Sequence, residues 1–368
     1  MQIIKQNGKY VIYGDAVKSL NKLPAKGHNY VIKYDKPPYG IGFYLAEEDS
    51  FKPNKSKIYG DFDKKTTQIV EAYKKSNKSI GVILSGDKGL GKTLFAKELA
   101  QKFQQENMPV ILANKGYKGI GSFISNIKQD SMILFDEFEK NFTPDDNKGI
   151  DNETEDQSSM LSIFDGVSEQ KHLYVITVND IFNLSEYFLN RPGRFMYAIR
   201  LEYPDTKQIK EFLNDSLNDD AKDQINSIIK FSYRVLLNYD TLAAIAFQLN
   251  SGFKFTEIIN DLNIMNIGTH MYSIKLIFDD GYEYVDNFVR ADLFKNEVDV
   301  NTMQFDVKFN SDSLNVNNEI LTVNGKDVSL SSIGEELAKH VKHGLNMEPL
   351  KRVELKINRR TGFKFDNI

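Results

Sequence analysis

The sequence predicts an α/β fold with three layers, in which helices cover both faces of a largely parallel sheet. Two observations lead to this prediction. Between residues 56 and 205, short apolar segments alternate with segments of helical periodicity, which is typical of strand–helix–strand units. Within that region, the segment Ser79–Thr93 (SIGVILSGDKGLGKT) has the pattern of a buried strand, a glycine-rich turn and the start of a helix.

The composition is that of a globular protein large enough for two or three domains. The chain has 368 residues, of which 41% are hydrophobic and 27% are charged. It contains no cysteine, which excludes disulfides, thiol catalysis and cysteine-ligated zinc. A formal net charge of -4 excludes a globally basic surface, but a local basic patch stays compatible with it. No apolar run is long enough to span a bilayer and the first residues lack a signal-peptide pattern, so we expect a cytoplasmic protein without a membrane partner.

Four regions follow one another along the chain. Residues 1–55 predict a small β-rich domain, and residues 56–205 predict the large α/β domain. Residues 206–267 have helical patterns only, and residues 268–368 return to strands with one helix, as in a small α+β domain.

The N-terminal region has mostly the pattern of strands. Two apolar segments flank Asn7-Gly8, a dipeptide that strongly favours a two-residue hairpin turn. Further strands are predicted at Tyr30–Tyr34 and Ile41–Leu45, and a short helix at Ala16–Leu23. No residue pattern here is typical of catalysis, so we expect a packing or adaptor role, with substrate contact as the alternative.

The large domain continues with strands that each end near polar residues. After the glycine-rich turn come the strand segments PVILAN (109–114), MILFDEFEK (132–140), LYVITVND (173–180) and Tyr197–Leu201. An acidic loop, 141–156, follows the second of these, and loops of that length are usually functional or mobile. Beyond this domain, helices are predicted at Asp205–Leu217, Ala221–Phe231, Tyr239–Leu249 and Lys254–Leu262, hairpins at 272–285 and 320–330, a helix opened by Ser332, and a strand at 353–357.

The glycine-rich turn has the spacing of a phosphate-binding loop, G-x-x-x-x-G-K-[ST]. Glycines allow backbone N–H groups to surround phosphate oxygens, and the following helix directs its positive end at the same anion. Lys92 is expected to reach the β- and γ-phosphates, and Thr93 to offer a hydroxyl to Mg²⁺. The predicted nucleotide-binding residues of this loop are Gly86, Asp87, Lys88, Gly89, Leu90, Gly91, Lys92, Thr93 and Leu94.

Later strands end in side chains suited to phosphoryl transfer. MILFDEFEK supplies Asp136, placed to bind Mg²⁺, and Glu137, which is suited to orient or deprotonate a water. LYVITVND ends with Asn179, whose amide is suited to bind the attacking water or the γ-phosphate. Arg191 and Arg194 follow in NRPGRF, and guanidinium groups suit the charge that spreads over a transferring phosphoryl group.

The joint order of these motifs resembles that of the AAA+ ATPases, most closely the AAA branch and the AAA-family ATPases encoded by large phages. The resemblance covers about residues 58–267. It rests on GDKGLGKT as Walker A, ILFDEFEK as Walker B, LSIFDGV (161–167), VITVND as sensor 1 and NRPGRF as the arginine-finger motif. It implies a P-loop NTPase core with a small helical lid, and hydrolysis of ATP with Mg²⁺.

The resemblance also implies a role for each motif residue. Lys92 and Thr93 hold phosphate and Mg²⁺, with Asp136 as the magnesium carboxylate. Glu137 activates the water, and Asn179 is the sensor.

Other residues match family features that involve a second subunit or the base. Arg191 and Arg194 match arginines that act on the neighbouring subunit's nucleotide, which implies a homo-oligomer, usually a hexameric ring. Tyr59 and Gly60 fall where the family places an adenine-contacting segment.

Tyr117, Lys118 and Gly119 fall where the AAA branch carries a pore loop that grips an extended polypeptide. Lys118 departs from the usual apolar middle residue, and a basic residue also suits a nucleic-acid phosphate. A surface tyrosine in a flexible loop is the plainer interpretation.

The predicted function is an ATP-driven ring motor that remodels or threads a macromolecule, with a protein substrate or partner still unidentified. A nucleic-acid-linked ATPase, such as a phage replication or recombination loader, is one alternative. An ATP-gated scaffold with little hydrolysis is another, and Glu137 argues against it. The lysine- and asparagine-rich composition fits a bacterial or phage origin.

Overall fold

A computed structural model gives the fold of the chain. It describes residues 2–6, 9–13, 18–26, 28–36, 41–48, 51, 59–142, 155–164, 170–189, 193–262, 264, 270–317, 319–332 and 349–359. The chain divides into two compact units, Met1–Leu201 and Glu202–Ile368. Within the described residues, no helix has the length and apolar character needed to cross a membrane.

The first unit is built on one sheet of ten strands, in the order β10-β6-β9-β8-β7-β4-β5-β1-β2-β3. The five strands from β10 to β7 are all parallel, which confirms the predicted sheet type. β6, β7, β8 and β9 are wholly buried, as expected for parallel strands covered on both faces, whereas β10 at the edge of the sheet is only partly buried. Their bounds are β6 (Ile80–Ser85), β7 (Val110–Leu112), β8 (Ser131–Phe135), β9 (His172–Val178) and β10 (Phe195–Arg200).

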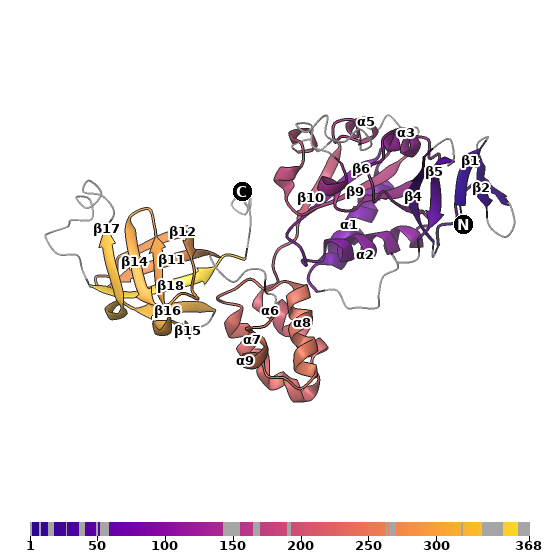
Figure 1. Cartoon of the computed structure of the whole chain (residues 1–368). Helices are drawn as coiled ribbons and strands as arrows, with labels where there is room; N and C mark the ends of the chain where they lie inside the picture. The colour runs from indigo at the N-terminus through magenta and orange to yellow at the C-terminus, as the bar shows by residue number, and fades with distance from the viewer. Residues whose placement is uncertain are drawn as a thin grey trace. The chain divides into compact units, whose positions relative to one another are not determined.

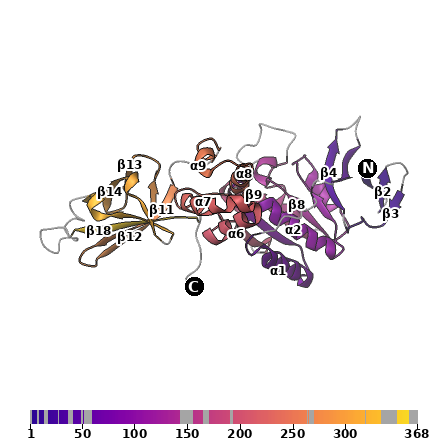
Figure 2. The same cartoon turned by 90° about the horizontal axis from the view of Figure 1, so that it is seen from below.

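The N-terminal strands continue this sheet instead of forming a sheet of their own. β4 pairs in parallel with β7, and β5, β1, β2 and β3 then follow in antiparallel pairs. Seen from below, the sheet runs from β9 through β8 and β4 to β2 and β3 (Figure 2). The bounds are β1 (Gln2–Gln6), β2 (Lys9–Tyr13), β3 (Lys18–Leu20), β4 (Asn29–Asp35) and β5 (Gly42–Glu47).

Two local predictions for this region have different outcomes. The strands on either side of Asn7-Gly8 do pair as an antiparallel hairpin, although these two residues lie outside the described ones. The helix predicted at Ala16–Leu23 is wrong, because Lys18–Leu20 forms strand β3 on the edge of β2. Pairing with an existing edge satisfies backbone groups that a single helical turn would leave open.

Helices cover both faces of the sheet (Figure 1). On one side lie α1 (Phe62–Lys75) and α2 (Lys92–Gln105), which pack against each other. On the other side lie α3 (Ile120–Ser125) and α5 (Leu161–Phe164), whose apolar residues share a core with those of β8 and β9. The short elements α4 (Phe138–Asn141), η2 (Ile181–Asn183) and η3 (Glu186–Phe188) follow β8 and β9.

The second unit begins with helices. Asp205 caps α6 and completes a capping box with Gln208, which explains why the helix starts where the sequence predicts. The predicted helix at Lys254–Leu262 is shorter in the structure, where α9 ends at Ile258. These helices surround one apolar core. Their bounds are α6 (Thr206–Ser216), η4 (Asp219–Gln224), α7 (Ile225–Phe231), α8 (Tyr239–Asn250) and α9 (Phe255–Ile258).

The remainder of this unit is β structure. Five strands form one sheet in the order β12-β11-β18-β16-β15, and three form a second in the order β13-β14-β17. Inward residues of both sheets share one core. The helix predicted after Ser332 lies outside the described residues. The bounds are β11 (His270–Phe278), β12 (Glu283–Ala291), β13 (Glu297–Asn301), β14 (Phe305–Asn310), η5 (Ser311–Ser313), β15 (Asn315–Asn317), β16 (Ile320–Asn324), η6 (Gly325–Asp327), β17 (Val328–Ser332) and β18 (Leu350–Ile357).

Candidate active site

The polar ends of three central strands meet at one edge of the sheet. β6, β9 and β8 are parallel neighbours, so their carboxyl ends lie together. Ser85, the last residue of β6, pairs with Val178 of β9, so Gly86 and Asn179 leave the sheet side by side. β8 ends at the same edge, immediately before Asp136. The sheet therefore brings together the phosphate-loop, carboxylate and amide motifs that the sequence predicts.

The loop after β6 has the backbone of a phosphate cradle. Gly86, Gly89 and Gly91 all have positive φ angles, of 145°, 77° and 90°. A Cβ on Gly86 would lie 2.6 Å from the carbonyl oxygen of Leu201, so no other residue fits there without displacement of the backbone. Gly91 is the N-cap of α2, which directs the positive end of that helix into the loop.

The Lys92 side chain folds back onto the phosphate loop and bonds to its backbone. Its ammonium donates to the carbonyl oxygens of Gly86 at 2.6 Å and Asp87 at 2.9 Å, and to the Asn179 side-chain oxygen at 3.0 Å. The residue is 8% exposed. Burial lowers the pKa of Lys92, and nearby carboxylates, Glu139 first, act in the opposite direction. A buried cation held by neutral carbonyls is suited to exchange them for phosphate oxygens.

The Asp136 carboxylate and the backbone of Glu137 are fixed by a residue that the sequence prediction missed. Thr177 of β9 donates its hydroxyl to Asp136 Oδ1 at 2.6 Å and accepts the backbone N–H of Glu137 at 2.8 Å. Glu137 has a left-handed backbone, with φ 48°. Such strain in a non-glycine residue is common where a site dictates geometry. The carboxylate of Glu137 pairs with Lys140 one turn later.

Asn179 is held on both sides. Its backbone N–H and its side-chain Nδ2 both donate to Oε1 of Glu139, at 2.8 and 2.7 Å. Its Oδ1 accepts from Lys92. Glu139 was not among the predicted site residues, although it stands only three positions after Asp136 in the same motif.

The remaining nucleotide-site candidates lie beside the loop. Thr93 is exposed at the first turn of α2, where its hydroxyl is accessible. Phe62 stands at the start of α1, 3.6 Å from where a Gly91 Cβ would be, and its ring packs on α2. Tyr59 and Gly60 precede Phe62 by a few residues, so this segment lies near the end of the loop; Tyr59 is half-buried.

Of the two predicted arginines, only one is described. Arg194 stands just before β10 and donates to the carbonyl oxygen of Tyr187 at 3.4 Å. Arg191 lies outside the described residues. A trans role for either stays a prediction, because it concerns a second subunit.

The Tyr117 ring packs against aromatic side chains of the N-terminal strands. Its ring centroid lies 5.4 Å from that of Tyr34 on β4 and 6.3 Å from that of Phe43 on β5. Lys118 is exposed, and Gly119 has φ 88° at the N-cap of α3. The N-terminal strands therefore contact the predicted substrate loop directly, which no pattern in the sequence indicates.

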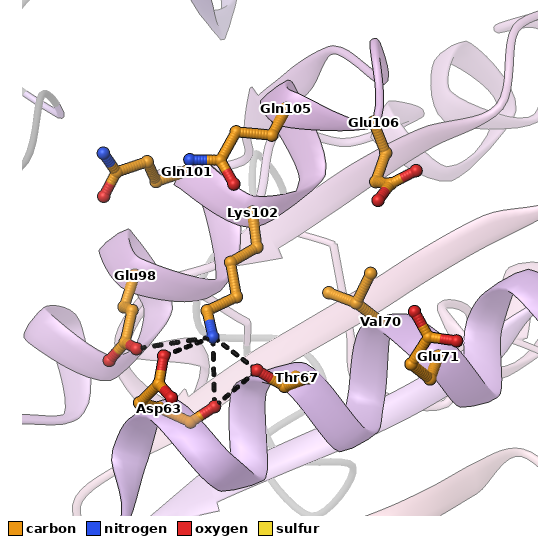
Figure 3. Close-up of a pocket in the computed structure, with 9 residues that line it drawn as sticks. All are labelled: Asp63, Thr67, Val70, Glu71, Glu98, Gln101, Lys102, Gln105 and Glu106. Carbon is orange, nitrogen blue, oxygen red and sulfur yellow. Dashed lines mark hydrogen bonds and ion pairs between the residues drawn. The ribbon is translucent and has the colours of Figure 1, made fainter.

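A separate groove between α1 and α2 contains none of the predicted site residues (Figure 3). Lys102 spans it, donating to the Asp63 side chain at 2.7 Å and to the Thr67 hydroxyl at 2.6 Å. Glu98 lies 3.9 Å from the same ammonium. These contacts fasten α1 to α2, so we assign the groove a structural role. Its lining residues are Asp63, Thr67, Val70, Glu71, Glu98, Gln101, Lys102, Gln105 and Glu106.

The residues at the sheet edge fit a magnesium nucleotide. Three positive-φ glycines and the buried Lys92 suit the phosphates, and Thr93 with Asp136 offers oxygen ligands. Within the described residues, no group of three or more acidic or histidine side chains is placed to hold a metal by itself. That agrees with Mg²⁺, which usually takes one or two carboxylates together with substrate phosphates.

The phosphate loop follows β6, and acidic residues follow β8, which lies two places away in the sheet. This arrangement defines the domain as a P-loop nucleotide-binding domain. Residues 82–203 match the sequence model of the "ATPase family associated with various cellular activities (AAA)". This domain therefore belongs to the AAA ATPases, which bind ATP with Mg²⁺.

Relatives in sequence agree with this assignment. The chain is 26% identical over 182 residues to a proteasome-associated ATPase of Saccharomonospora viridis, covering 41% of this chain and 30% of that protein. It is 29% identical over 154 residues to an "AAA ATPase forming ring-shaped complexes" of Corynebacterium kroppenstedtii, covering 36% and 27%. A putative cell division cycle ATPase of Plasmodium falciparum is 27% identical over 162 residues, covering 40% and 13%. The chain thus spans less than a third of the length of these relatives.

Proposed function

We propose that this protein is an ATP-hydrolysing ring motor that remodels or threads a protein substrate. The observation that carries the proposal is the direct bond between Lys92 of the phosphate loop and Asn179 at the end of β9, next to the Asp136 carboxylate, which Thr177 fixes, and to Glu137. The residues that we assign to phosphate binding, metal coordination, water activation and γ-phosphate recognition therefore lie at one edge of one sheet.

Each residue has a distinct part in hydrolysis. Lys92 leaves the loop carbonyls and binds the β- and γ-phosphates, which neutralises charge that grows in the transition state. Thr93 and Asp136 would hold Mg²⁺, which supplies further charge neutralisation on the phosphate oxygens. Glu137 orients the attacking water and accepts its proton, after release of its carboxylate from Lys140. Asn179 donates to the γ-phosphate or the water.

The ring is proposed from the relatives and the arginine motif. Two Corynebacterium relatives are described as forming ring-shaped complexes. In such a ring, Arg191 and Arg194 would complete the site of the neighbouring copy, where a guanidinium is suited to the transferring phosphoryl group. We propose a hexamer, with Tyr59 and Gly60 beside the adenine, and Tyr117, Lys118 and Gly119 contacting the substrate.

Replacement of Glu137 by Gln tests the hydrolytic part. The variant keeps the side-chain volume and loses the base, so we expect ATP turnover to fall at least about 10²-fold while ATP still binds. Glu71→Gln on the exposed face of α1 is the matched control and should keep full turnover. Turnover by Glu137→Gln equal to the parent protein would remove Glu137 from its assigned role.

Subunit mixing tests the ring. Arg194→Ala copies and Lys92→Ala copies are each expected to be inactive alone, for different reasons. In a mixed ring, some interfaces pair an intact loop with an intact arginine, so mixtures should recover part of the turnover. Mixtures that never exceed the sum of the two separate proteins would contradict a trans role for Arg194.

The exposed Lys118 favours one second candidate, a nucleic-acid-linked ATPase. Single-stranded DNA should then stimulate turnover, with a steep decrease as salt rises. Stimulation by an unfolded protein such as reduced casein, with little salt dependence, supports the protein motor instead.

A further inference from the structure

A three-member chain of polar contacts links the phosphate loop to α4. Lys92 donates to Asn179 Oδ1 at 3.0 Å, and Asn179 Nδ2 donates to Glu139 Oε1 at 2.7 Å. The backbone N–H of Asn179 donates to the same oxygen at 2.8 Å. One carboxylate oxygen thus holds both the main chain and the side chain of the predicted sensor.

These bonds fix which way the Asn179 amide faces. A carboxylate accepts hydrogen bonds and an ammonium only donates them, so the amide nitrogen must face Glu139 and the amide oxygen must face Lys92. Without Glu139, the flip that exchanges nitrogen and oxygen would be opposed by Lys92 alone. The amide nitrogen carries two protons, so one is left for a phosphate oxygen or a water after the bond to Glu139.

The second carboxylate oxygen of Glu139, Oε2, helps to explain why an acceptor stands at this position. Oε2 is buried and has no hydrogen-bond partner among the described residues. A buried carboxylate oxygen without a hydrogen-bond partner costs stability. An apolar residue would avoid that cost. The position of Oε1 against Asn179 is therefore the feature that accounts for a hydrogen-bond acceptor here.

Glu139 differs from its neighbour Glu137 in direction and partners. Glu137 pairs with Lys140, and both side chains are about half exposed. Glu139 bonds inward to Asn179, and of the carboxylates around Lys92 it acts most strongly on that ammonium. The two glutamates of DEFEK therefore face different partners: Glu137 faces Lys140, and Glu139 faces the predicted sensor.

We propose that Glu139 is a positioning residue that fixes the Asn179 amide so that it can recognise the γ-phosphate. The inference rests on the proposed ATPase function and assigns a residue to it that the motif pattern alone leaves unexplained. Glu139 acts through Asn179 and does not itself touch the nucleotide.

A double-mutant cycle tests this assignment. Asn179→Ala is expected to lower kcat for ATP by about 10²-fold, as loss of one preorganised donor does. Glu139→Ala should lower kcat by about 10- to 100-fold while the KM for ATP and the affinity for ADP change by less than about threefold. Glu139→Gln keeps Oε1 and should retain kcat within about threefold. The double variant Glu139→Ala/Asn179→Ala should be no slower than Asn179→Ala alone.

Several outcomes would overturn the proposal. Additive losses in the double variant would show that Glu139 acts independently of Asn179. Equal damage from Gln and Ala would mean that the charge matters and not the acceptor. A parallel loss of kcat, ADP affinity and thermal midpoint would indicate a purely structural role.

A readout without hydrolysis separates this inference from the proposed function. If the parent protein does not turn over ATP, the proposed function fails. The ratio of ATPγS affinity to ADP affinity still reports γ-phosphate recognition. Glu139→Ala should lower that ratio about tenfold, as Asn179→Ala does, and an unchanged ratio would refute the positioning role.

Discussion

The buried histidine of β9 makes the stability of the first unit sensitive to acid. His172 is fully buried, and its Nδ1 contacts the Ser131 hydroxyl at 2.9 Å across the β8–β9 pair. Its Nε2 has no partner among the described residues. A second ring proton would therefore be buried without an acceptor. Burial lowers the pKa of His172 from 6.5 to about 4.

The magnitude follows from proton linkage. The unfolded chain binds a proton at this histidine below about pH 6.5, whereas the folded chain binds it only near pH 4. The stabilising contribution is therefore complete above pH 6.5 and is lost as the pH falls toward 4. Between pH 7.5 and pH 5.0, these two pKa values give a loss of roughly 2 kcal/mol.

His172→Asn removes the titrating group and keeps a polar atom near Ser131. Urea unfolding followed by circular dichroism at pH 7.5 and pH 5.0 gives the loss of stability for each protein. The variant should lose roughly 2 kcal/mol less than the parent, because the cost of the smaller side chain is the same at both pH values and cancels. Equal losses in the two proteins would show that His172 is not held neutral by the fold.

Three further variants test local packing. Gly86→Ala should abolish the rise in thermal midpoint caused by ADP, because the new Cβ would lie 2.6 Å from the Leu201 carbonyl oxygen and a φ of 145° disfavours alanine. A midpoint that still rises with ADP would contradict the loop geometry. Burial raises the pKa of Glu98, so the charged carboxylate destabilises the fold above that pKa. Glu98→Gln should therefore raise the urea midpoint at pH 8, and the gain should shrink at acid pH. A lower midpoint at pH 8 would disprove this expectation. The chain has no tryptophan, so Tyr117→Trp provides a single tryptophan fluorophore. Its emission should shift to the red when Phe43→Ala is added to the same protein, because the packed ring is lost. Identical emission spectra with and without Phe43→Ala would show that the two rings do not pack.

Local sequence patterns were enough to predict the central architecture. The parallel strands were predictable because each is a short apolar run between helical segments. The phosphate loop was predictable because its chemistry depends on residues that are adjacent in the chain, from Gly86 to Thr93. Helix α6 was predictable because Asp205 and Gln208 carry its capping box within four positions.

Contacts between distant segments could not be predicted in the same way. Thr177 supports Asp136 only because Phe135 pairs with Ile176 in the β8–β9 register, and that register is invisible in either strand alone. Glu139 lies two residues after Glu137 in the same motif, but its contact with Asn179 could not be predicted because Asn179 is 40 positions away. The strand at Lys18–Leu20 was mistaken for a helix because its structure depends on the edge offered by β2.

The N-terminal strands affect how the predicted substrate loop can move. β4 is the direct neighbour of β7, and the Tyr117 loop starts after β7, so Tyr34 and Phe43 are placed against Tyr117 by the sheet itself. Aromatic pairs contribute about 0.5–1.5 kcal/mol each beyond their buried area, so two pairs hold the loop by about 1 to 3 kcal/mol. That range corresponds to a factor of about 5 to 150 in population. A loop held this way has a preferred position, and in the proposed motor a difference of that size between nucleotide states would be enough to release it. In the proposed motor, the N-terminal strands would therefore act together with the substrate loop, and a substitution in them is expected to change how strongly a substrate stimulates turnover before it changes ATP binding.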